Sequence, residues 1–386
     1  MTQRRICVVL TSRGNYGKLK SVMKAILAAP ELELRVVVGG SLVLDKYGKV
    51  LESEYVDLPP IDRFVHFVVE GENLLTMAKS AGLALMEFSA VFDQLSPDVV
   101  MVIADRFECL PIATAAAYMN CPVAHIEGGE LSGSIDESIR HAITKMAHIH
   151  FPATSEAKDR IIKMGESEST VHCVGSTSLD VLNQLELSSL SEIREFQLNH
   201  GVGDVVDLNP RGYLVVIQHP VTTEYGQAYA NVKETVHAID SLKIPTVWIW
   251  PNMDAGSDGV SKALRDYREE LTPRHVQFFK SLPIELFGPL LSNAGCLVGN
   301  SSSGIRETAF LGVPTVNIGT RQNGRQRGKN VVDVMYDSDE ITHAIKRQLE
   351  IGQYPPDHLY GAGDAAAKIV AKLKSEPIRI QKQNRY

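Results

Sequence analysis

Cysteine and long apolar runs are both scarce in this sequence. The five cysteines are odd in number and widely spaced, without a CxxC pair, so free buried thiols are expected rather than disulfides or a structural metal site. No apolar run reaches the roughly 18 to 20 residues that span a bilayer, and the first residues pass straight into a strand-like segment without a signal-peptide cleavage region. These absences predict a cytoplasmic protein with no membrane partner.

Positive charge is also in short supply. The formal net charge is -7 at pH 7, and the isoelectric point is near 6.0. A general nucleic-acid binder needs a basic face that displaces phosphate counterions, so no nucleic-acid partner is expected. A local basic pocket is still compatible with this composition.

Short apolar runs alternate with helical patterns along most of the chain, whose 386 residues fit two domains better than one. Strands are predicted at 5–10, 34–40, 98–104, 122–127, 149–154 and 171–175, and again at 213–219, 245–250, 276–279, 295–300 and 314–319. Helices are predicted at 17–29, 73–94, 108–119, 138–147 and 155–164, with Ser138 and Ser155 as candidate N-caps. The alternation predicts an α/β fold of two Rossmann-like domains with parallel sheets.

A more polar segment with a weaker strand pattern separates the two series of strands, and a domain junction is expected near 185–210. The sequence therefore predicts an N-terminal domain over 1–185 and a C-terminal domain over 210–360. The last segment, 361–386, contains a helical pattern followed by a tail. By analogy with other two-domain folds, this helix is expected to pack back on the N-terminal domain.

The segment GNSSSGIRE at 299–307 follows a predicted strand and is expected to open a helix. Ligands of open α/β sheets bind beyond the carboxyl ends of the strands. The hydroxyls of Ser301 and Ser302 and the amide of Gly304 would then lie at a helix N-terminus, where a diphosphate is favoured. The alternative is a serine-rich cap that satisfies its own helix. Glu307 could accept hydrogen bonds from ribose hydroxyls or be an exposed helix residue.

Four cations of this acidic chain follow separate predicted strands: Arg13, Lys18, Arg106 and Arg321. The planar fork of arginine binds phosphate oxygens in pairs. Convergence of the four would therefore predict an anion site, whereas each of them alone could equally be a surface cation.

Three carboxylates, Asp105, Glu127 and Asp136, follow two predicted strands of the first half. A buried carboxylate beside others can act as an acid or a base near neutral pH, and helix caps or salt-bridge partners are the alternative. His219 ends the predicted strand at 213–219. It could contact a leaving phosphate or shuttle a proton, or it could be an ordinary capped histidine.

Seven motifs together resemble the hydrolysing UDP-N-acetylglucosamine 2-epimerases. They are RGNYGKL (13–19), ADRFE (104–108), HIEGGELSGSIDESIRHAITKMAH (125–148), QHPVTTE (218–224), PNMDAGSDG (251–259), GNSSSGIRE (299–307) and GTRQNGR (319–325). They follow one another in order within residues 6 to 370. The similarity is especially close to the epimerase domain of the bifunctional animal enzyme and to bacterial enzymes of sialic and legionaminic acid synthesis.

The resemblance implies a fold of the GT-B type, with a UDP-binding C-terminal domain and the active site in the interdomain cleft. By motif position it implies that Asp105, Glu127 and Asp136 are catalytic, with His219 beside the diphosphate. It implies UDP binding by Arg13, Arg106, Asn252, Ser301, Ser302, Glu307 and Arg321, and uracil binding by the backbone at Leu282. Lys18 and Arg140 also match the substrate-binding pattern.

The implied activity converts UDP-N-acetylglucosamine and water to N-acetylmannosamine and UDP through 2-acetamidoglucal, without a metal or other cofactor. The same reaction on UDP-2,4-diacetamido-2,4,6-trideoxyglucose is the nearest alternative. A non-hydrolysing epimerase, a glycosyltransferase of the same fold and a non-catalytic UDP-sugar binding module are more distant alternatives. The resemblance also implies a homodimer or homotetramer.

Overall fold

The computed structural model describes residues 3–45, 60–251, 254–383 and 385. The chain divides into two compact units, each with its own sheet. Unit 1 comprises Met1–Glu130, Ile135–Asn183 and Tyr360–Tyr386, and unit 2 comprises Leu131–Ser134 and Gln184–Leu359. Four residues from the first half of the chain thus belong to the second unit.

The sheet of unit 1 has six strands in the order β3-β2-β1-β4-β5-β6, and every neighbouring pair is parallel. The strands are β1 (Arg4–Leu10), β2 (Leu32–Gly39), β3 (Arg63–Val65), β4 (Val99–Ile103), β5 (Val123–Ile126) and β6 (Ile149–Phe151). The predicted strand at 171–175 was wrong, because Val171 forms only an isolated bridge with His150. The short edge strand β3 was not predicted.

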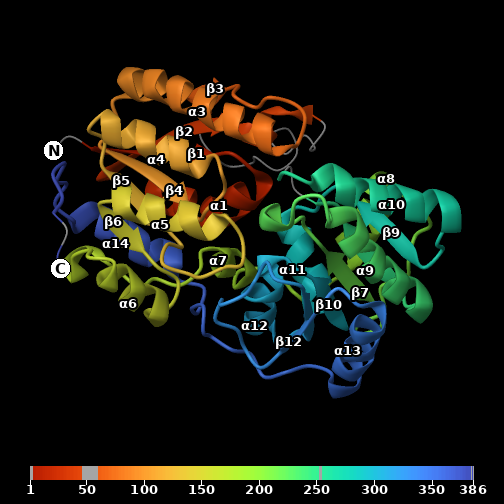
Figure 1. Ribbon diagram of the computed structural model, residues 1–386. Helices are drawn as coiled ribbons and strands as arrows, with labels where there is room; N and C mark the ends of the chain where they lie inside the picture. The colour runs from red at the N-terminus through yellow and green to blue at the C-terminus, as the bar shows by residue number, and fades with distance from the viewer. Residues whose placement is uncertain (1–2, 46–59, 252–253, 384, 386) are drawn as a thin grey trace. The chain divides into compact units, whose positions relative to one another are not determined.

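Helices cover both faces of this sheet (Figure 1). The side chains of Ile6, Val8 and Leu10 in β1 share a core with α1 (Arg13–Leu27) and α14 (Ala365–Ser375). The alternate residues Cys7 and Val9 share a second core with α3 (Leu74–Leu95), α4 (Cys109–Tyr118) and α5 (Asp136–Met146). This alternation is the period of two that a strand buried on both faces requires.

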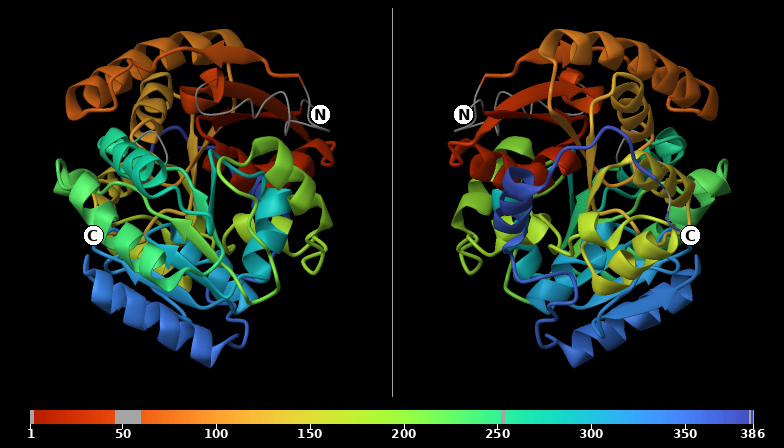
Figure 2. Two further views of the ribbon diagram at one scale, coloured as in Figure 1. Left: turned by 90° about the vertical axis from the view of Figure 1, so that its right-hand side faces the viewer. Right: turned by 90° about the vertical axis from the view of Figure 1, so that its left-hand side faces the viewer.

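The C-terminal helix α14 lies beside α1, which is the helix nearest the N-terminus (Figure 2). Unit 1 also contains the small helices α6 (Ser155–Lys163) and α7 (Ser178–Leu182) and the 3-10 turns η1 (Gly40–Val43) and η3 (Glu168–Thr170). Both predicted N-caps were wrong. Helix α5 begins two residues before Ser138, and α6 is capped by Thr154, whose hydroxyl accepts from the Ala157 amide. An N-cap needs extended backbone, which Thr154 has and Ser155 lacks.

The sheet of unit 2 is also parallel and has the order β12-β11-β10-β7-β8-β9. Its strands are β7 (Leu214–Ile217), β8 (Thr246–Ile249), β9 (Val276–Phe279), β10 (Cys296–Gly299), β11 (Thr315–Ile318) and β12 (Val331–Val334). Helices α9 (Ala228–Leu242), α10 (Ser257–Leu271) and α13 (Ser338–Ile351) bury their apolar sides in its core. The remaining helices are α8 (Ser191–His200), α11 (Ile284–Ser292) and α12 (Glu307–Leu311).

In each sheet the strand order reverses once, between β1 and β4 in unit 1 and between β10 and β7 in unit 2. Such a reversal leaves a crevice beyond the carboxyl ends of the two strands, where α/β proteins bind ligands. Arg13 and Asp105 follow the reversal strands of unit 1, and His219 and Ser301 follow those of unit 2. The fold therefore puts candidate residues at the ligand-binding edge of each sheet.

The five cysteines are free, as expected. Four of them are buried, and Cys173 is exposed, so the expectation of buried thiols was wrong for that residue alone.

Candidate active site

The ends of β4 and β5 carry two non-glycine residues in the left-handed region, Ala104 (φ 61°) and Glu127 (φ 60°). Each such residue costs about 1 kcal/mol or more and persists where its surroundings fix it. The buried ring of His125 supplies one restraint, because Nε2 lies 2.8 Å from the Ala104 carbonyl and Nδ1 lies 3.2 Å from the Thr144 hydroxyl. Nε2 therefore donates its proton, and Nδ1 accepts. Burial lowers the pKa of His125 to about 4, so the ring is neutral at pH 7.

Glu127 is fully buried, and both of its carboxylate oxygens receive a donor. Lys18 on α1 donates to Oε2 at 2.7 Å, and the hydroxyl of Ser176 donates to Oε1 at 2.7 Å. Ser178 lies 3.0 Å from the Ser176 hydroxyl and extends the network. Burying a carboxylate is costly unless it is paired and hydrogen-bonded, and these donors offset that cost. The predicted residues Lys18 and Glu127 thus come together as an ion pair.

Asp105 is held by Arg140, a buried residue on α5. Oδ2 of Asp105 accepts from Nε at 2.9 Å and also from Nη2, while Nη1 donates to the Glu130 carbonyl at 2.6 Å. Burial lowers the pKa of Arg140, but the charges of Asp105 and Glu130 outweigh it and raise the pKa above its usual value. Asp136 is the first residue of α5, where the helix dipole favours a negative charge. The resemblance implies a substrate-binding role for Arg140, whereas in the structure Arg140 binds Asp105, one of the candidate catalytic residues.

Arg106 and Arg13 occupy different surroundings. The Nε of Arg106 donates to Oε1 of Glu108 at 2.7 Å, and Glu108 is fully buried. Arg13 is the first residue of α1, directly after the N-cap Ser12. Unit 1 therefore holds three of the four cations of the predicted anion site, while Arg321 belongs to unit 2. Their convergence on one anion stays a prediction.

In unit 2 a buried asparagine, Asn300, organises the ends of β7 and β10. Its Oδ1 accepts from the His219 amide at 2.7 Å, and its Nδ2 donates to the His219 carbonyl at 2.9 Å. Its own carbonyl accepts from Arg321 at 3.1 Å and from the Gln322 side chain at 2.8 Å. The predicted residues His219 and Arg321 thus both contact Asn300. Asn300 lies directly after β10, within the segment 299–307, but the sequence analysis gave it no role of its own.

The segment 299–307 differs from its prediction. A 3-10 turn, η5 (Ser302–Gly304), comes first, and the helix α12 starts only at Glu307. The Ser301 hydroxyl accepts from the Ser303 amide, and the Gly304 amide donates to the Ser301 carbonyl at 3.1 Å. The prediction that the Gly304 amide lies at a helix N-terminus was therefore wrong. Ser301 instead fits the alternative of a serine-rich cap, because its hydroxyl caps the turn of its own segment. Gly304 serves packing, because a Cβ there would lie 2.9 Å from side-chain carbons of Leu297 and Thr315.

Glu307 is buried, which contradicts the alternative of an exposed helix residue. Its Oε2 is enclosed and has no hydrogen-bond partner within the described part of the chain. Such an oxygen is costly to leave unpaired, so the site favours a ligand that brings a donor. Leu282 is buried in the loop between β9 and α11. Asn252 lies outside the described residues.

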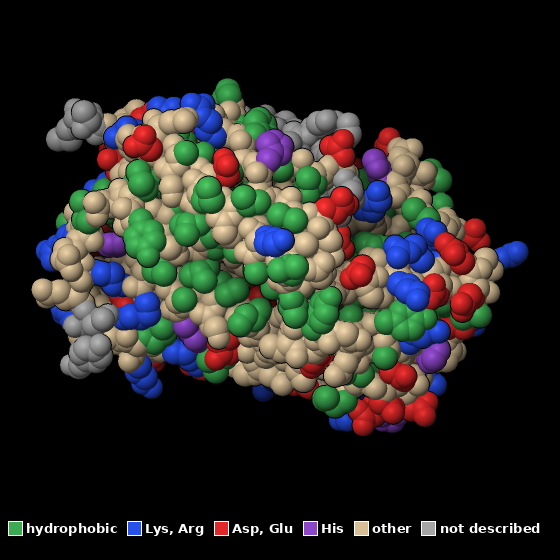
Figure 3. All heavy atoms as spheres, turned by 45° about the horizontal axis from the view of Figure 1, so that its top comes forward, with side chains coloured by type: hydrophobic (Ala, Val, Ile, Leu, Met, Phe, Trp, Pro, Cys, Tyr) green, Lys and Arg blue, Asp and Glu red, His purple; other side chains and the backbone are tan. Residues whose placement is uncertain are grey.

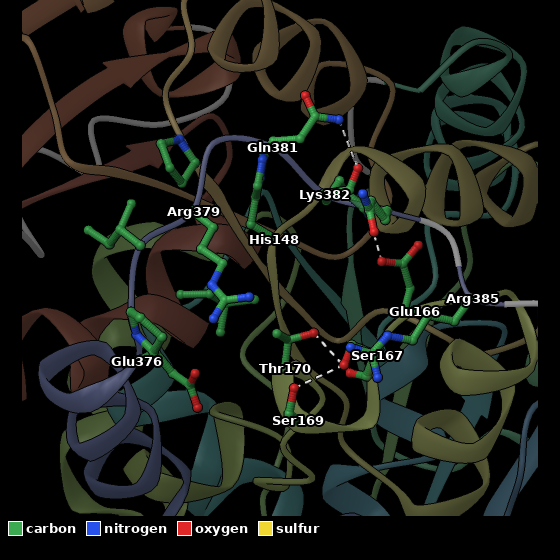
Figure 4. A pocket seen from close by; sticks show the side chains of 15 residues that line it. His148, Glu166, Ser167, Ser169, Thr170, Glu376, Arg379, Gln381, Lys382 and Arg385 are labelled. Atoms are coloured by element: carbon green, nitrogen blue, oxygen red, sulfur yellow. Dashed lines mark hydrogen bonds and ion pairs between the residues drawn. The ribbon is translucent and has the colours of Figure 1, made fainter.

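A cavity of about 680 Å³ in unit 1 contains none of the predicted site residues. It lies between the C-terminal tail and the segment from α6 to η3, and Figure 4 shows Lys382 of the tail pointing toward Glu166. The Lys382 ammonium donates to Glu166 at 2.7 Å and to the carbonyls of Lys145 and Ala147 at 2.8 and 2.7 Å. The tail thus anchors the C-terminal end of α5, the helix that carries Asp136 and Arg140.

Comparison with known proteins identifies the family and the fold. The model of the family "UDP-N-acetylglucosamine 2-epimerase" matches residues 24–374. A UDP-N-acetylglucosamine 2-epimerase of Neisseria meningitidis serogroup B is 33% identical over 361 residues, which cover 94% of this chain and 92% of that protein. A UDP-N,N'-diacetylbacillosamine 2-epimerase (hydrolyzing) of Legionella pneumophila subsp. pneumophila is 31% identical over 382 residues, covering 99% and 98%.

A solved structure of Methanocaldococcus jannaschii UDP-GlcNAc 2-epimerase, in complex with UDP-GlcNAc and UDP, matches with a TM-score of 0.77. It is 19% identical and covers 96% of this chain and 99% of that chain, so the likeness concerns the fold. It confirms the predicted α/β fold with two Rossmann-like parallel sheets. The family match and the two relatives establish that the chain belongs to the UDP-N-acetylglucosamine 2-epimerase family.

Proposed function

We propose that this protein is a hydrolysing 2-epimerase, which converts UDP-N-acetylglucosamine and water to N-acetylmannosamine and UDP. The observation that carries the proposal is the pair of carboxylates at the ends of the adjacent strands β4 and β5. Asp105 is bound by Arg140, and Glu127 is bound by Lys18. Inverting a carbon centre takes one group that removes a proton and another that returns one, and these carboxylates supply such groups.

The C2 proton of the sugar is weakly acidic, because no carbonyl is attached to that carbon. We assign the first step to an elimination, in which a carboxylate takes the C2 proton while the bond from C1 to the diphosphate oxygen breaks. The electron pair of the C2–H bond forms the C1–C2 double bond of 2-acetamidoglucal. UDP leaves with the electrons of the broken C–O bond, so the step is redox-neutral.

The role of unit 2 in the proposal is to bind UDP and to stabilise the charge that builds on it. Arg321 supplies a cation, and His219 is fixed beside it through Asn300. Groups that are already oriented toward developing charge give a large part of many rate enhancements. The enclosed Oε2 of Glu307 would accept a hydrogen bond from a ribose hydroxyl, which satisfies an atom that has no hydrogen-bond partner among the described residues.

In the second proposed step, water adds its hydroxyl to C1, and a proton returns to C2 from the face opposite the one that lost it. The proton that water loses returns to the acid that protonated C2, and the first carboxylate releases the C2 proton to solvent, so the enzyme is restored and the product is N-acetylmannosamine. Asp136 is the third candidate acid or base of unit 1. The only co-substrate besides the UDP-sugar is water, and neither step changes an oxidation state overall, so the reaction calls for no redox cofactor.

A second candidate substrate is UDP-2,4-diacetamido-2,4,6-trideoxyglucose. It is favoured by the Legionella relative, which matches nearly the whole chain. The two relatives differ by only two percentage points in identity (33% and 31%) and bear different printed activities. Identity alone therefore does not choose between the sugars.

The test is an NMR time course of the full chain with each UDP-sugar in deuterated water, with the Glu127→Gln variant as the matched control. We expect free N-acetylmannosamine that carries deuterium at C2, together with UDP, and a turnover at least about a hundredfold lower in the variant. Turnover of the diacetamido sugar alone would transfer the proposal to that substrate. Release of an epimerised sugar still attached to UDP, or no turnover of either sugar, would refute hydrolytic epimerisation.

A further inference from the structure

The cavity between the C-terminal tail and the segment from α6 to η3, the tail cavity, lies entirely within unit 1. Its volume of about 680 Å³ is within the range of about 300 to 1,000 Å³ that is usual for small-molecule sites. None of the candidate active-site residues lines it. A ligand of the tail cavity would therefore be bound by residues that the proposed reaction does not use.

The chain itself holds the walls of this cavity in place. The Arg385 amide donates to the Gly165 carbonyl at 2.8 Å, and Nε2 of His148 lies 2.9 Å from the Ile380 carbonyl. Gly165 has φ 92°, and a Cβ there would lie 3.0 Å from the Arg385 carbonyl oxygen, so a glycine lets the tail approach this closely. Together with the anchor at Lys382, these contacts attach the tail at separate points. The cavity is thus formed before any ligand binds.

The charged side chains of the tail cavity leave two arginines without an acid. Its walls carry two acidic and three basic residues. Glu166 is paired with two lysine ammonium groups at 2.5 and 2.7 Å, and Oε1 of Glu376 lies 2.7 Å from Nε2 of His172. The guanidinium groups of Arg379 and Arg385 have no hydrogen bond or ion pair within the described part of the chain. The cavity therefore carries positive charge that an anion would neutralise.

We propose that the tail cavity binds a small organic phosphate, whose phosphoryl group is held by Arg379 and Arg385. Figure 4 shows both side chains extending from the tail into the cavity. Figure 3 shows lysines and arginines, in blue, along the edge of unit 1 where the tail lies in Figure 1. Each guanidinium presents a planar fork of donors that matches two phosphate oxygens.

The other wall of the cavity adds a hydroxyl donor. The Oγ atoms of Ser167 and Ser169 lie 2.9 Å apart, so one hydroxyl donates to the other. The proton of the accepting hydroxyl is then available to a phosphate oxygen. Thr170 does not add a second donor, because its hydroxyl already donates to the Ser167 carbonyl at 2.9 Å. A phosphoryl group would thus be bound from both walls.

Apolar side chains of the same cavity suit the organic part of the ligand. Pro122, Ile149, Pro377 and Ile378 line it. Ile149 is buried, and Ile378 packs against the core of unit 1. Ligand sites are usually lined in this way, by apolar side chains with a few polar groups that fix the orientation. The mixture favours a phosphate ester with an apolar or ring body over inorganic phosphate.

A phosphoryl group could belong to a lipid headgroup or to a free phosphate ester, and the fold favours the free ester. Helix α3 is long and apolar enough to cross a bilayer by length and composition alone, which the sequence analysis did not anticipate. Phe88 and Phe92 of α3 pack into the core of unit 1, however, and no residue of α3 lines the tail cavity. The only candidate span among the described residues is thus separate from the cavity.

The first test titrates the full chain with phenyl phosphate by calorimetry, with UDP present to fill the proposed substrate site. We expect a Kd of about 1 mM or lower, and Arg379→Gln and Arg385→Gln should each raise it about tenfold or more. Arg347→Gln is the matched control, because Arg347 is an exposed arginine on α13 of unit 2, and it should leave the Kd unchanged. Absence of binding at about 10 mM, binding that UDP abolishes, or an unchanged Kd in both tail variants would overturn the proposal.

The second test concerns the ligand class. Inorganic phosphate and benzoate should each bind about tenfold or more weakly than phenyl phosphate, since one lacks the apolar body and the other the phosphoryl group. Equal binding of either would overturn the assignment to an organic phosphate. Sedimentation with vesicles of phosphatidylserine and phosphatidylcholine that Arg379→Gln abolishes would overturn the assignment to a free ester.

The third test locates the ligand by protection of the tail from subtilisin. A phosphate bound from both walls stabilises the attached tail, so phenyl phosphate at about ten times its Kd should slow cleavage of the tail about tenfold. Arg379→Gln should lose this protection, and Arg347→Gln should keep it. An unchanged rate of cleavage in the wild type would overturn the location. These tests need no turnover, so they stand apart from the proposed function.

Discussion

Replacing Arg140 with methionine should destabilise unit 1 strongly. The Arg140 side chain is 1% exposed, and it binds Asp105 through two nitrogens and the Glu130 carbonyl through a third. Removing one partner of a buried ion pair costs about 3 to 5 kcal/mol. The Asp105 side chain is 17% exposed, so water can reach it and the lower end of that range applies. Loss of the hydrogen bond from Arg140 to the Glu130 carbonyl adds about 1 kcal/mol, for a total of about 3 to 4 kcal/mol.

The assay is thermal unfolding followed by far-UV circular dichroism. Both tryptophans, Trp248 and Trp250, belong to unit 2, so tryptophan fluorescence reports on that unit and serves as an internal reference. A loss of 3 to 4 kcal/mol corresponds to a fall of about 6 to 16 °C in the melting temperature of a unit of this size. We expect the dichroism midpoint to move and the fluorescence midpoint to stay closer to wild type.

The double variant Asp105→Asn with Arg140→Met separates stability from catalysis. It also removes the carboxylate that Arg140→Met leaves without its arginine, so it should regain about half of the lost stability while staying inactive. A loss below about 1 kcal/mol in Arg140→Met would refute the buried-pair argument. So would a double variant that is as unstable as the single one.

Three further predictions concern residues that support the site. His125→Gln retains a donor toward Ala104 and should flatten the dependence of stability on pH between pH 6.5 and 4. The wild type should lose stability as the pH falls through this range, because the unfolded chain binds a proton that the buried ring does not take up until about pH 4. An equally steep loss of stability in the variant would count against this explanation. Ser176→Ala removes the hydroxyl that donates to Glu127 and should lower kcat about 10- to 100-fold, while the Kd of UDP, measured by calorimetry, stays constant. A higher Kd with a normal kcat would contradict the role of Ser176 as a donor to Glu127. Burial alone would raise the pKa of Glu166, but donors including Lys382 lower it to about 2, so the contribution of the ionised Glu166 to folding stability is lost as the pH falls from 4.5 to 2. Glu166→Gln should remove that pH dependence, lower the free energy of unfolding by about 2 to 3 kcal/mol at pH 7 and speed proteolysis of the C-terminal tail. An unchanged rate of proteolysis would argue against the anchoring of the tail by Glu166.

The core strands of both sheets could be predicted from the sequence because they are buried on both faces. Their apolar runs, such as that of β1, need no knowledge of neighbours. The edge strands were harder. β3 has three residues, two of them exposed, and β12 has no fully buried residue, so neither gives a continuous apolar run. The reverse error arose at 171–175, where Val171 and Val174 are buried but the segment forms only an isolated bridge with the edge strand β6.

The candidate site shows the same division between local and distant information. Carboxylates that follow strands, such as Asp105 and Glu127, can be found from position along the chain. Their partners cannot, because Ser176 lies 49 residues from Glu127 and Arg140 lies 35 residues from Asp105. Asn300 lies in the polar segment found from the sequence, but its role was missed: its side chain bonds to the backbone of His219, and no residue type in the sequence signals such a contact.

Two of the three candidate catalytic carboxylates, Glu127 and Asp105, are held from opposite faces of the same sheet. Lys18 reaches Glu127 from α1, which packs on one face, and Arg140 reaches Asp105 from α5, which packs on the other. A proton gained by one carboxylate weakens the attraction to its own cation, since a neutral acid no longer forms an ion pair. Separate cations thus hold the two carboxylates, Lys18 on one face of the sheet and Arg140 on the other. The proposed epimerisation has two proton transfers, at different moments and on different faces of the sugar, and each carboxylate would change its protonation state beside its own cation.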